Sequence, residues 1–157
     1  MPRRPPRLPP LLPDFDDDER EAVLAANRGF YRAFSDRDAA AMVLLWAPAG
    51  PMVCLHPGQA ALHERGEIMA SWRAIMRHPE APRVRCMSEW VVGRPGLAIV
   101  VCREILPNAQ LMATNTFARL TDGWYIIGHH SAPVAPVESE ATVTATPASA
   151  RGRGTLH

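Results

Sequence analysis

The stretch Val53–Trp72 reads VCLHPGQAALHERGEIMASW, and the rest of the chain is organised around it. Its apolar start predicts a short strand over Met52–Leu55 that runs into the turn His56–Gly58. After a polar loop, apolar residues at helical spacing predict a helix over Gly66–Arg77. A titratable side chain between a buried strand and a turn is typical of a pocket rim, so His56 is the first candidate for chemistry.

Two helices are predicted before this stretch. The first covers about Glu19 to Ser35, where apolar residues recur at helical spacing at Val23, Ala26, Phe30 and Phe34. Aspartates before it supply an N-terminal cap and a favourable charge in the first turn. The second helix is shorter and covers Ala39–Trp46, and the prolines and glycine of residues 48–51 end it.

Four strands joined by tight turns are predicted after the stretch, over Arg83–Val92, Leu97–Leu106, Gln110–Leu120 and Trp124–Ser131. In the first of them, alternation puts Cys86, Ser88 and Trp90 on one face. In the last, alternation puts Ile126 and His130 on one face and Ile127 and His129 on the other, and it leaves open which face points inward.

Composition narrows the classes of function. The 157 residues fit one domain, and 47% of them are apolar, which is enough for a substantial core. A net charge of +1 gives no electrostatic reason to expect a nucleic acid or a membrane as partner. All 17 basic residues are arginine, so mechanisms that need a Schiff-base lysine, a phosphate-loop lysine or a lysine base are excluded.

The cysteines Cys54, Cys86 and Cys102 are far apart and form no CxxC pair, so neither a disulfide framework nor a zinc site is expected. Buried thiols favour a reducing compartment, and no apolar run is long enough for a transmembrane helix, so a cytoplasmic protein is expected. Prolines near the start interrupt the apolar run of a secretory leader. Residues 1–18 and 134–157 are predicted to be disordered on either side of one domain over 19–133.

The order of elements and their residues resemble the nuclear transport factor 2-like superfamily, in particular its SnoaL-like branch, which also holds relatives of ketosteroid isomerase. The matching residues lie between about Glu19 and Pro133 and are Phe30, Tyr31, Phe34, Asp38, Met42, Trp46, His56–Gly58, Gly66, Ser71, Trp72, Ala113–Phe117, Asp122–Trp124 and His129–Pro133. The resemblance implies an α+β cone, in which a curved, mostly antiparallel sheet wraps on three N-terminal helices around an apolar interior. It also implies a homodimer through the outer face of the sheet.

The same superfamily contains isomerases, dehydratases, epoxide hydrolases, cyclases and non-catalytic binding or assembly domains, so the resemblance is specific for the fold and not for the activity. His56 stands where the isomerases have a general-base aspartate, and a histidine accepts a proton near neutral pH. The alternative is that His56 only holds its turn. Asn115 stands where the isomerases have a protonated acid, and its amide is also a donor for an oxyanion. The alternative is that Asn115 satisfies a neighbouring polar group.

One position departs from the isomerases more strongly. Phe30 replaces their oxyanion-hole tyrosine, and a phenyl ring has no proton to donate. Tyr31 follows directly, but in a helix it points about 100° away from Phe30. Steroid isomerase activity itself is therefore not expected.

Three more titratable residues complete the candidate catalytic set. One of His129 and His130 is expected to face the cone as a second acid or base. Glu104 interrupts an apolar strand, and a buried carboxylate needs a partner. An ion pair with Arg103 or Arg119 is the favoured explanation, and catalysis is the alternative. No metal or cofactor is expected, because ligand spacing such as His-x-His is absent.

The interior is expected to be lined by Phe30, Tyr31, Met42, Trp46, Trp72, Trp90 and Glu104, which suits a small, planar, mostly apolar ligand. One hypothesis is a cofactor-free isomerase, dehydratase, cyclase or hydrolase that acts on a carbonyl-type ligand, with His56 as base and Asn115 as polarising donor. The other is a ligand-binding or dimeric accessory module without turnover, favoured by the missing tyrosine and aspartate. An assembly domain whose tails recruit partners is a third possibility.

Overall fold

The computed structural model describes residues 15–134. They form three helices and five strands, which are α1 (Asp17–Ser35), α2 (Ala39–Leu45), β1 (Val53–Leu55), α3 (Arg65–Arg77), β2 (Arg85–Arg94), β3 (Leu97–Leu106), β4 (Ala109–Arg119) and β5 (Trp124–Pro133). The order of these elements and the α+β class confirm the sequence prediction, and the boundaries differ from the predicted ones by at most two residues. Most of the predicted N-terminal arm and C-terminal tail lies outside the described residues.

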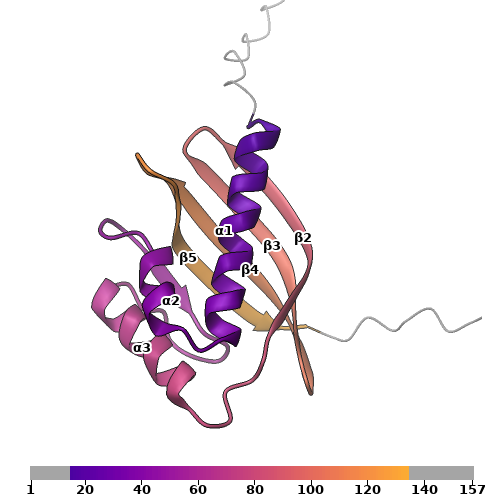
Figure 1. Ribbon diagram of the computed structural model, residues 1–157. Helices are drawn as coiled ribbons and strands as arrows, with labels where there is room; N and C mark the ends of the chain where they lie inside the picture. Colours follow the sequence, from indigo (N-terminus) through magenta and orange to yellow (C-terminus); the bar gives the residue numbers. More distant parts are fainter. Residues whose placement is uncertain (1–14, 135–157) are drawn as a thin grey trace, which may run out of the picture.

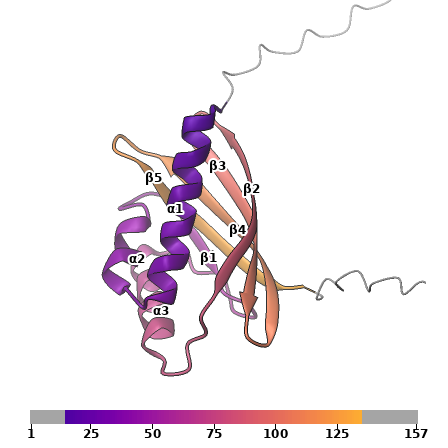
Figure 2. The same ribbon diagram turned by 45° about the vertical axis from the view of Figure 1, so that its right-hand side comes forward.

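The strands make one sheet in the order β1-β5-β4-β3-β2, antiparallel throughout except that β1 pairs in parallel with β5. Figures 1 and 2 show that all three helices lie on one side of this curved sheet. Helix α1 runs along the concave face, and α2 and α3 cover the end near β1. The core lies between helices and sheet, and none of the three helices covers the opposite face of the sheet.

The two N-terminal helices begin at aspartate caps. The Asp16 side chain accepts a hydrogen bond from the backbone N–H of Glu19 at 2.8 Å, so α1 starts at Asp17, two residues earlier than predicted. Asp38 caps α2 in the same way by accepting from the N–H of Ala41. Helix α1 buries the polar Asn27 and Tyr31 along with Val23 and Phe30, so its inner face carries polar groups into the core.

Phe15, just before α1, packs against the core. Its ring packs edge-on against Trp124, with 5.9 Å between the ring centroids. It also lies directly over Gly93 in β2, where a Cβ atom would come within 2.6 Å of the phenyl ring. Gly93 is therefore needed for close approach rather than for an unusual backbone angle.

A bulge in β5 decides which histidine faces inward. Thr116 pairs with Gly128 and Phe117 pairs with Ile126, so Ile127 is an extra residue with no partner. The extra residue shifts the alternation of side chains by one position. Ile126 is buried before the bulge, and His129 and Ser131 are buried after it, whereas His130 is exposed. The prediction that Ile126 and His130 share a face is therefore wrong.

A second bulge, in β2, corrects the position predicted for Trp90. The pairing moves from Met87 with Arg103 to Trp90 with Val101, which leaves one residue too many on β2, and Ser88 has a positive φ of 55°. Beyond the bulge Val91 points inward and Trp90 points outward with 66% of its surface exposed. Trp90 thus lies on the outer face of the sheet and does not line the interior.

Within residues 15–134, no helix is both long enough and apolar enough to cross a membrane.

Candidate functional site

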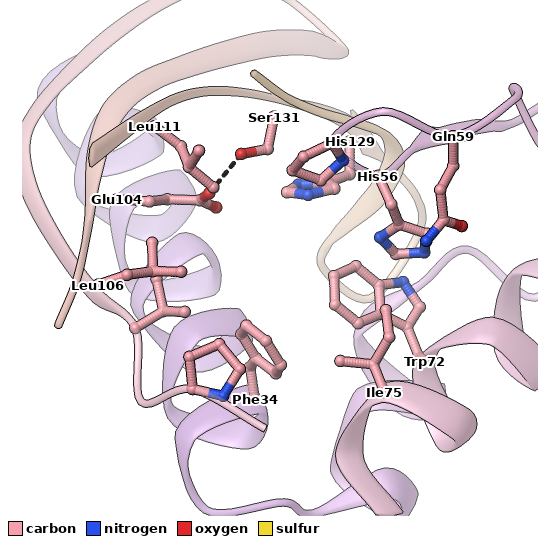
Figure 3. Close-up of a pocket in the computed structure, with 13 residues that line it drawn as sticks. Phe34, His56, Gln59, Trp72, Ile75, Glu104, Leu106, Leu111, His129 and Ser131 are labelled. Carbon is pink, nitrogen blue, oxygen red and sulfur yellow. Dashed lines mark hydrogen bonds between the residues drawn. The ribbon is translucent and has the colours of Figure 1, made fainter. Parts of the chain in front are cut away.

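A cavity of about 180 Å³ lies between α3, the end of α1 and the sheet. Figure 3 shows His56, Trp72 and Ile75 on one side of it and Glu104 and Leu106 on the other. The lining is mostly apolar, and its polar members are His56, Gln59, Glu104, His129 and Ser131. These residues come from segments far apart in the sequence, so the cavity exists only in the folded chain.

His56 reaches the cavity because β1 ends directly before it. Its Nε2 atom lies 2.9 Å from the Ser71 hydroxyl on α3, and that hydroxyl donates its single hydrogen to the carbonyl oxygen of Ile68. The Ser71 oxygen must therefore accept, so Nε2 of His56 carries the proton and Nδ1 keeps its lone pair. The ring also packs edge-on against Trp72, and burial lowers the pKa of His56 below its usual value.

His129 is held by a hydrogen bond to Asn115. Its Nδ1 atom lies 2.7 Å from Oδ1 of Asn115, and this oxygen only accepts, so Nδ1 carries the proton and Nε2 is free. Burial, together with the nearby His56 and His130, lowers the pKa of His129 to about 3. His129 is therefore a neutral ring with a fixed tautomer and one free lone pair.

The orientation of Asn115 is fixed in turn by a chain of amides that ends at the surface. Asn115 donates from Nδ2 to Oδ1 of Asn27 at 2.7 Å, and Asn27 donates to Glu89 at 2.8 Å. Glu89 is anchored by the Nε atom of Arg28 at 3.1 Å. Both amides donate in the same direction, away from His129. This series of hydrogen bonds therefore allows only one placement of the oxygen and nitrogen atoms in each amide.

Glu104 is a buried carboxyl on the wall opposite His56. It accepts a hydrogen bond from the Tyr31 hydroxyl at 2.9 Å and another from the Ser131 hydroxyl. Burial raises the pKa of Glu104, although the two hydroxyls oppose that shift. Burial and the neighbouring Glu104 also raise the pKa of Tyr31, so Tyr31 keeps its proton and stays a donor.

The favoured explanation of Glu104 as one half of an ion pair is wrong. Among the described residues no arginine lies within salt-bridge distance of Glu104. Arg103 instead donates to Gln110 at 2.9 Å, because alternation along β3 sends it to the outer face. Glu104 points inward, where hydroxyl groups rather than a cation satisfy it.

The structure brings together some of the residues expected from the sequence and separates others. The cavity wall contains His56, Trp72, Glu104 and His129. Phe30 and Tyr31 lie one layer behind, where Phe30 packs against Trp72 and His129. The remaining candidates lie elsewhere: Met42 and Trp46 in the core, His130 and Trp90 on the outer side, and Asn115 behind His129.

Asn115 does not have the geometry expected of a donor to a ligand. It is fully buried, and its Nδ2 group already donates to Asn27 and, at 3.3 Å, to the Tyr31 hydroxyl. Its place behind His129 makes it a positioning residue. The alternative considered from the sequence, in which Asn115 satisfies a neighbouring polar group, is the one that the geometry fits.

Three polar residues of the site were not singled out by the sequence patterns. Ser71 and Ser131 each bond a titratable group of the cavity, and Asn27 orients Asn115. Asn27 lies on the apolar stripe of the first helix, and a polar residue in such a place is a signal for a buried contact. The two serines are among the residues that match the superfamily, but no local pattern gives either of them a bonding role, since each bonds a residue of another segment.

Within residues 15–134, no cluster of three or more His, Cys, Asp or Glu side chains has the geometry to hold a metal ion.

The comparisons with known families and structures agree with this architecture. The model of the SnoaL-like domain matches residues 23–136. A "putative dehydratase from the NTF2-like family" of Streptomyces avermitilis is 30% identical, with a TM-score of 0.70 over 76% of this chain and 99% of that one. No curated protein matches the chain.

Two other solved structures are similar. A "putative calcium/calmodulin-dependent protein kinase type II association domain" of Thiobacillus denitrificans is 29% identical, with a TM-score of 0.63 over 71% of this chain and 94% of that one. A protein with a cystatin-like fold from Burkholderia xenovorans is 23% identical, with a TM-score of 0.67 over 78% and 96% of the two chains. The second likeness concerns the fold alone.

Proposed function

The chain belongs to the SnoaL-like domain family, and from this premise we propose that it carries out cofactor-free acid–base chemistry, an isomerisation or a dehydration, on a small ligand in the cavity. One observation supports this above all others. Two neutral histidines and a carboxyl with a raised pKa converge on a cavity whose walls are otherwise mostly apolar. Titratable groups with shifted pKa values in such a cavity are typical of acid–base sites.

His56 is the base in this proposal. Its Nδ1 lone pair is free, because Nε2 is bonded to Ser71. His129 is a weak base, since its pKa is about 3, and it serves to bind and orient the ligand. Glu104 stands across the cavity from His56 and is the acid, because burial favours its protonated form.

In a dehydration these groups act on neighbouring carbons of the ligand. His56 removes a proton from one carbon, and the electron pair of that C–H bond forms the new carbon–carbon double bond. The C–O bond of the adjacent carbon breaks, and the proton of Glu104 goes to the departing hydroxyl to give water. Proton transfer from His56 back to Glu104 restores the starting state. The similarity to the Streptomyces avermitilis protein supports this reaction class.

Solvent exchange tests the proposal even where the product of the reaction is not identified. The protein is incubated in D₂O with cyclic β-hydroxy ketones, and with any ligand that native mass spectrometry finds bound to it. Proton abstraction replaces a carbon-bound hydrogen by deuterium, which NMR detects even when no net reaction occurs. We expect exchange that His56→Gln lowers by about 10²- to 10⁴-fold.

Two variants control this experiment. Glu104→Gln should slow the loss of water, while His130→Gln, the same change on the outer face, should leave both steps unchanged. Exchange that survives in His56→Gln would exclude His56 as the base. A bound ligand that neither exchanges nor reacts would favour a binding module.

A specific observation favours a second candidate, a dimeric accessory or assembly module. The outer face of the sheet exposes four large apolar side chains, those of Met87, Trp90, Val92 and Leu97. These residues adjoin one another on β2 and β3, because Trp90 pairs with Val101, Val92 with Ile99 and Leu97 with Arg94. An apolar surface of this kind is typical of a protein interface, and the similarity to an "association domain" is consistent with it.

A further inference from the structure

We propose that the cavity binds a neutral ligand with a single ring whose hydroxyl groups donate hydrogen bonds to His56 and His129. This inference rests on the proposed function only in that both use the same cavity. It adds hydroxyl donors to the carbonyl-type ligand expected from the sequence. Three features of the cavity support it: its size, its hydrogen-bonding groups and its charge.

The size of the cavity limits the number of rings that a bound ligand has inside it. A cavity of about 150 Å³ lined by apolar side chains is known to hold one benzene molecule, and this one measures about 180 Å³. It therefore has room inside for one six-membered ring with a few substituents. Phe34 and Trp72 contribute aromatic surface to its wall, which suits a planar ring.

The hydrogen-bonding groups on the wall are mostly acceptors. Both histidines donate their ring proton to a residue that does not line the cavity. Nε2–H of His56 donates to the Ser71 hydroxyl, and Nδ1–H of His129 donates to Oδ1 of Asn115. Each ring therefore offers only a lone pair to the cavity. The Ser131 hydroxyl is also used, since it donates to Glu104. A ligand that only accepts, such as an ether, leaves both histidines without a partner.

The charge of the wall excludes an anionic ligand. Among the described residues that line the cavity there is no arginine, and the chain contains no lysine. A carboxylate or phosphate would meet the lone pairs of two neutral histidines and the carboxyl of Glu104. A cationic ligand would need a fixed negative charge, whereas burial favours the neutral form of Glu104. A neutral ligand with hydroxyl groups suits all of these groups, because a hydroxyl donates to the lone pair of a histidine and accepts from the protonated carboxyl of Glu104.

Four single-ring probes of similar size test the proposal on the whole chain at neutral pH. They are resorcinol, its dimethyl ether 1,3-dimethoxybenzene, benzoate and benzylamine, and binding is measured by calorimetry and by NMR shifts. We expect resorcinol to bind at least about 10-fold more tightly than the ether, a difference of about 1.4 kcal/mol. Benzoate and benzylamine should bind no more tightly than the ether.

Single substitutions test whether His56 and His129 cause the preference for resorcinol over its ether. His129→Leu and His56→Leu should each bring resorcinol down towards the affinity of the ether and leave the ether unaffected. His130→Leu, on the outer face, should change neither affinity. Binding of the ether serves as the check that a variant is folded, and the comparison among probes on the unaltered chain needs no variant at all.

Several results would overturn the inference. Equal binding of resorcinol and its ether, tighter binding of benzoate or benzylamine, or no binding of resorcinol at millimolar concentration would each do so. The outcome is also separate from that of the proposed chemistry. A chain that prefers resorcinol but shows no hydrogen exchange with any ligand would retain this inference and lose the acid–base proposal.

Discussion

At the scale of single residues, the buried His129 makes the stability of the folded chain depend on pH. Its pKa is about 3 in the folded chain against 6.5 in an exposed histidine, so the unfolded chain binds one more proton between these values. Stability must then fall as the pH falls through this range, by about 1 kcal/mol for each pH unit. His56 acts in the same direction, because its pKa is lowered as well.

Urea denaturation at several pH values between about 7 and 4 measures this slope. His129→Gln should make the slope shallower, and His130→Gln should change it much less, because burial and not His130 is the main cause of the lowered pKa of His129. A slope unchanged in His129→Gln would show that other groups cause the acid sensitivity.

Asn115 fixes the tautomer of His129 through a single contact of 2.7 Å between its Oδ1 atom and Nδ1 of His129. Asn115→Asp puts a carboxylate at that distance, and a negative charge so close favours the imidazolium form. We expect the pKa of His129 to rise by more than one unit, which NMR titration of the ring resonances measures. Asn108→Asp, the same substitution in the exposed turn between β3 and β4, is the control. An unchanged pKa in Asn115→Asp would contradict the positioning role.

Glu104 makes stability depend on pH in the opposite direction to His129. Its pKa in the folded chain is raised above the usual 4.5, so the folded chain keeps a proton that the unfolded chain loses. Stability from this group is present at low pH and is lost as the pH rises through the raised pKa. Glu104→Gln removes that loss, and the Ser131 hydroxyl is able to turn from donor to acceptor to meet the new amide. The difference in unfolding free energy, variant minus unaltered chain, should therefore increase between pH 5 and pH 8. A constant difference over this range would exclude a buried ionisation at Glu104.

At the scale of secondary structure elements, two glycines in different settings predict opposite effects of one substitution. Gly93→Ala in β2 brings a Cβ atom within 2.6 Å of the Phe15 ring, so Phe15 must move and stability should fall by about 1 to 3 kcal/mol. Gly66→Ala in the first turn of α3 meets no atom within 4 Å. Because alanine favours a helix, stability should rise there by up to about 1 kcal/mol. Urea denaturation measures the change in unfolding free energy for both variants. Two changes of the same sign would contradict the packing of Phe15 on β2.

The bulge of β5 also belongs to this scale, since it sets the direction of every later side chain in the strand. If Ile127 paired regularly with Thr116 instead of forming a bulge, alternation would turn His130 and not His129 towards the cavity. The hydrogen bond to Asn115 needs an inward histidine at the position opposite Asn115, and His129 occupies that position. One unpaired residue thus decides which histidine is part of the site.

At the scale of the whole molecule, the uncovered face of the sheet predicts self-association. Trp90→Glu places a charge in the centre of the apolar residues of β2 and β3, and burial of that charge in an interface would be costly. We expect the unaltered chain to sediment as a dimer and Trp90→Glu as a monomer. Leu44→Glu is the control, because Leu44 is 75% exposed on α2, away from this face. A monomeric unaltered chain at high micromolar concentration would exclude the dimer.

The sequence by itself was sufficient for the succession of helices and strands. Local signals of short range set these features: Asp16 and Asp38 cap helices, and Asp122-Gly123 joins two strands. The same kind of signal placed His56 at the end of β1, where it does line the cavity. The resemblance to the superfamily rested on these local features, and the SnoaL-like family model confirms it.

Tertiary structure alone decided which side chains meet. Strict alternation of side chains failed at Ile127 and at the bulge of β2, because the register against a neighbouring strand, not the sequence of one strand, determines where an extra residue is accommodated. The bulges therefore turned His129 and not His130 inward, and they sent Trp90 outward. Glu104 received hydroxyl partners in place of an arginine, since Tyr31 and Ser131 come from segments 73 and 27 residues away. Contacts over such separations depend on the packed sheet and helices, and no local pattern in the chain records them.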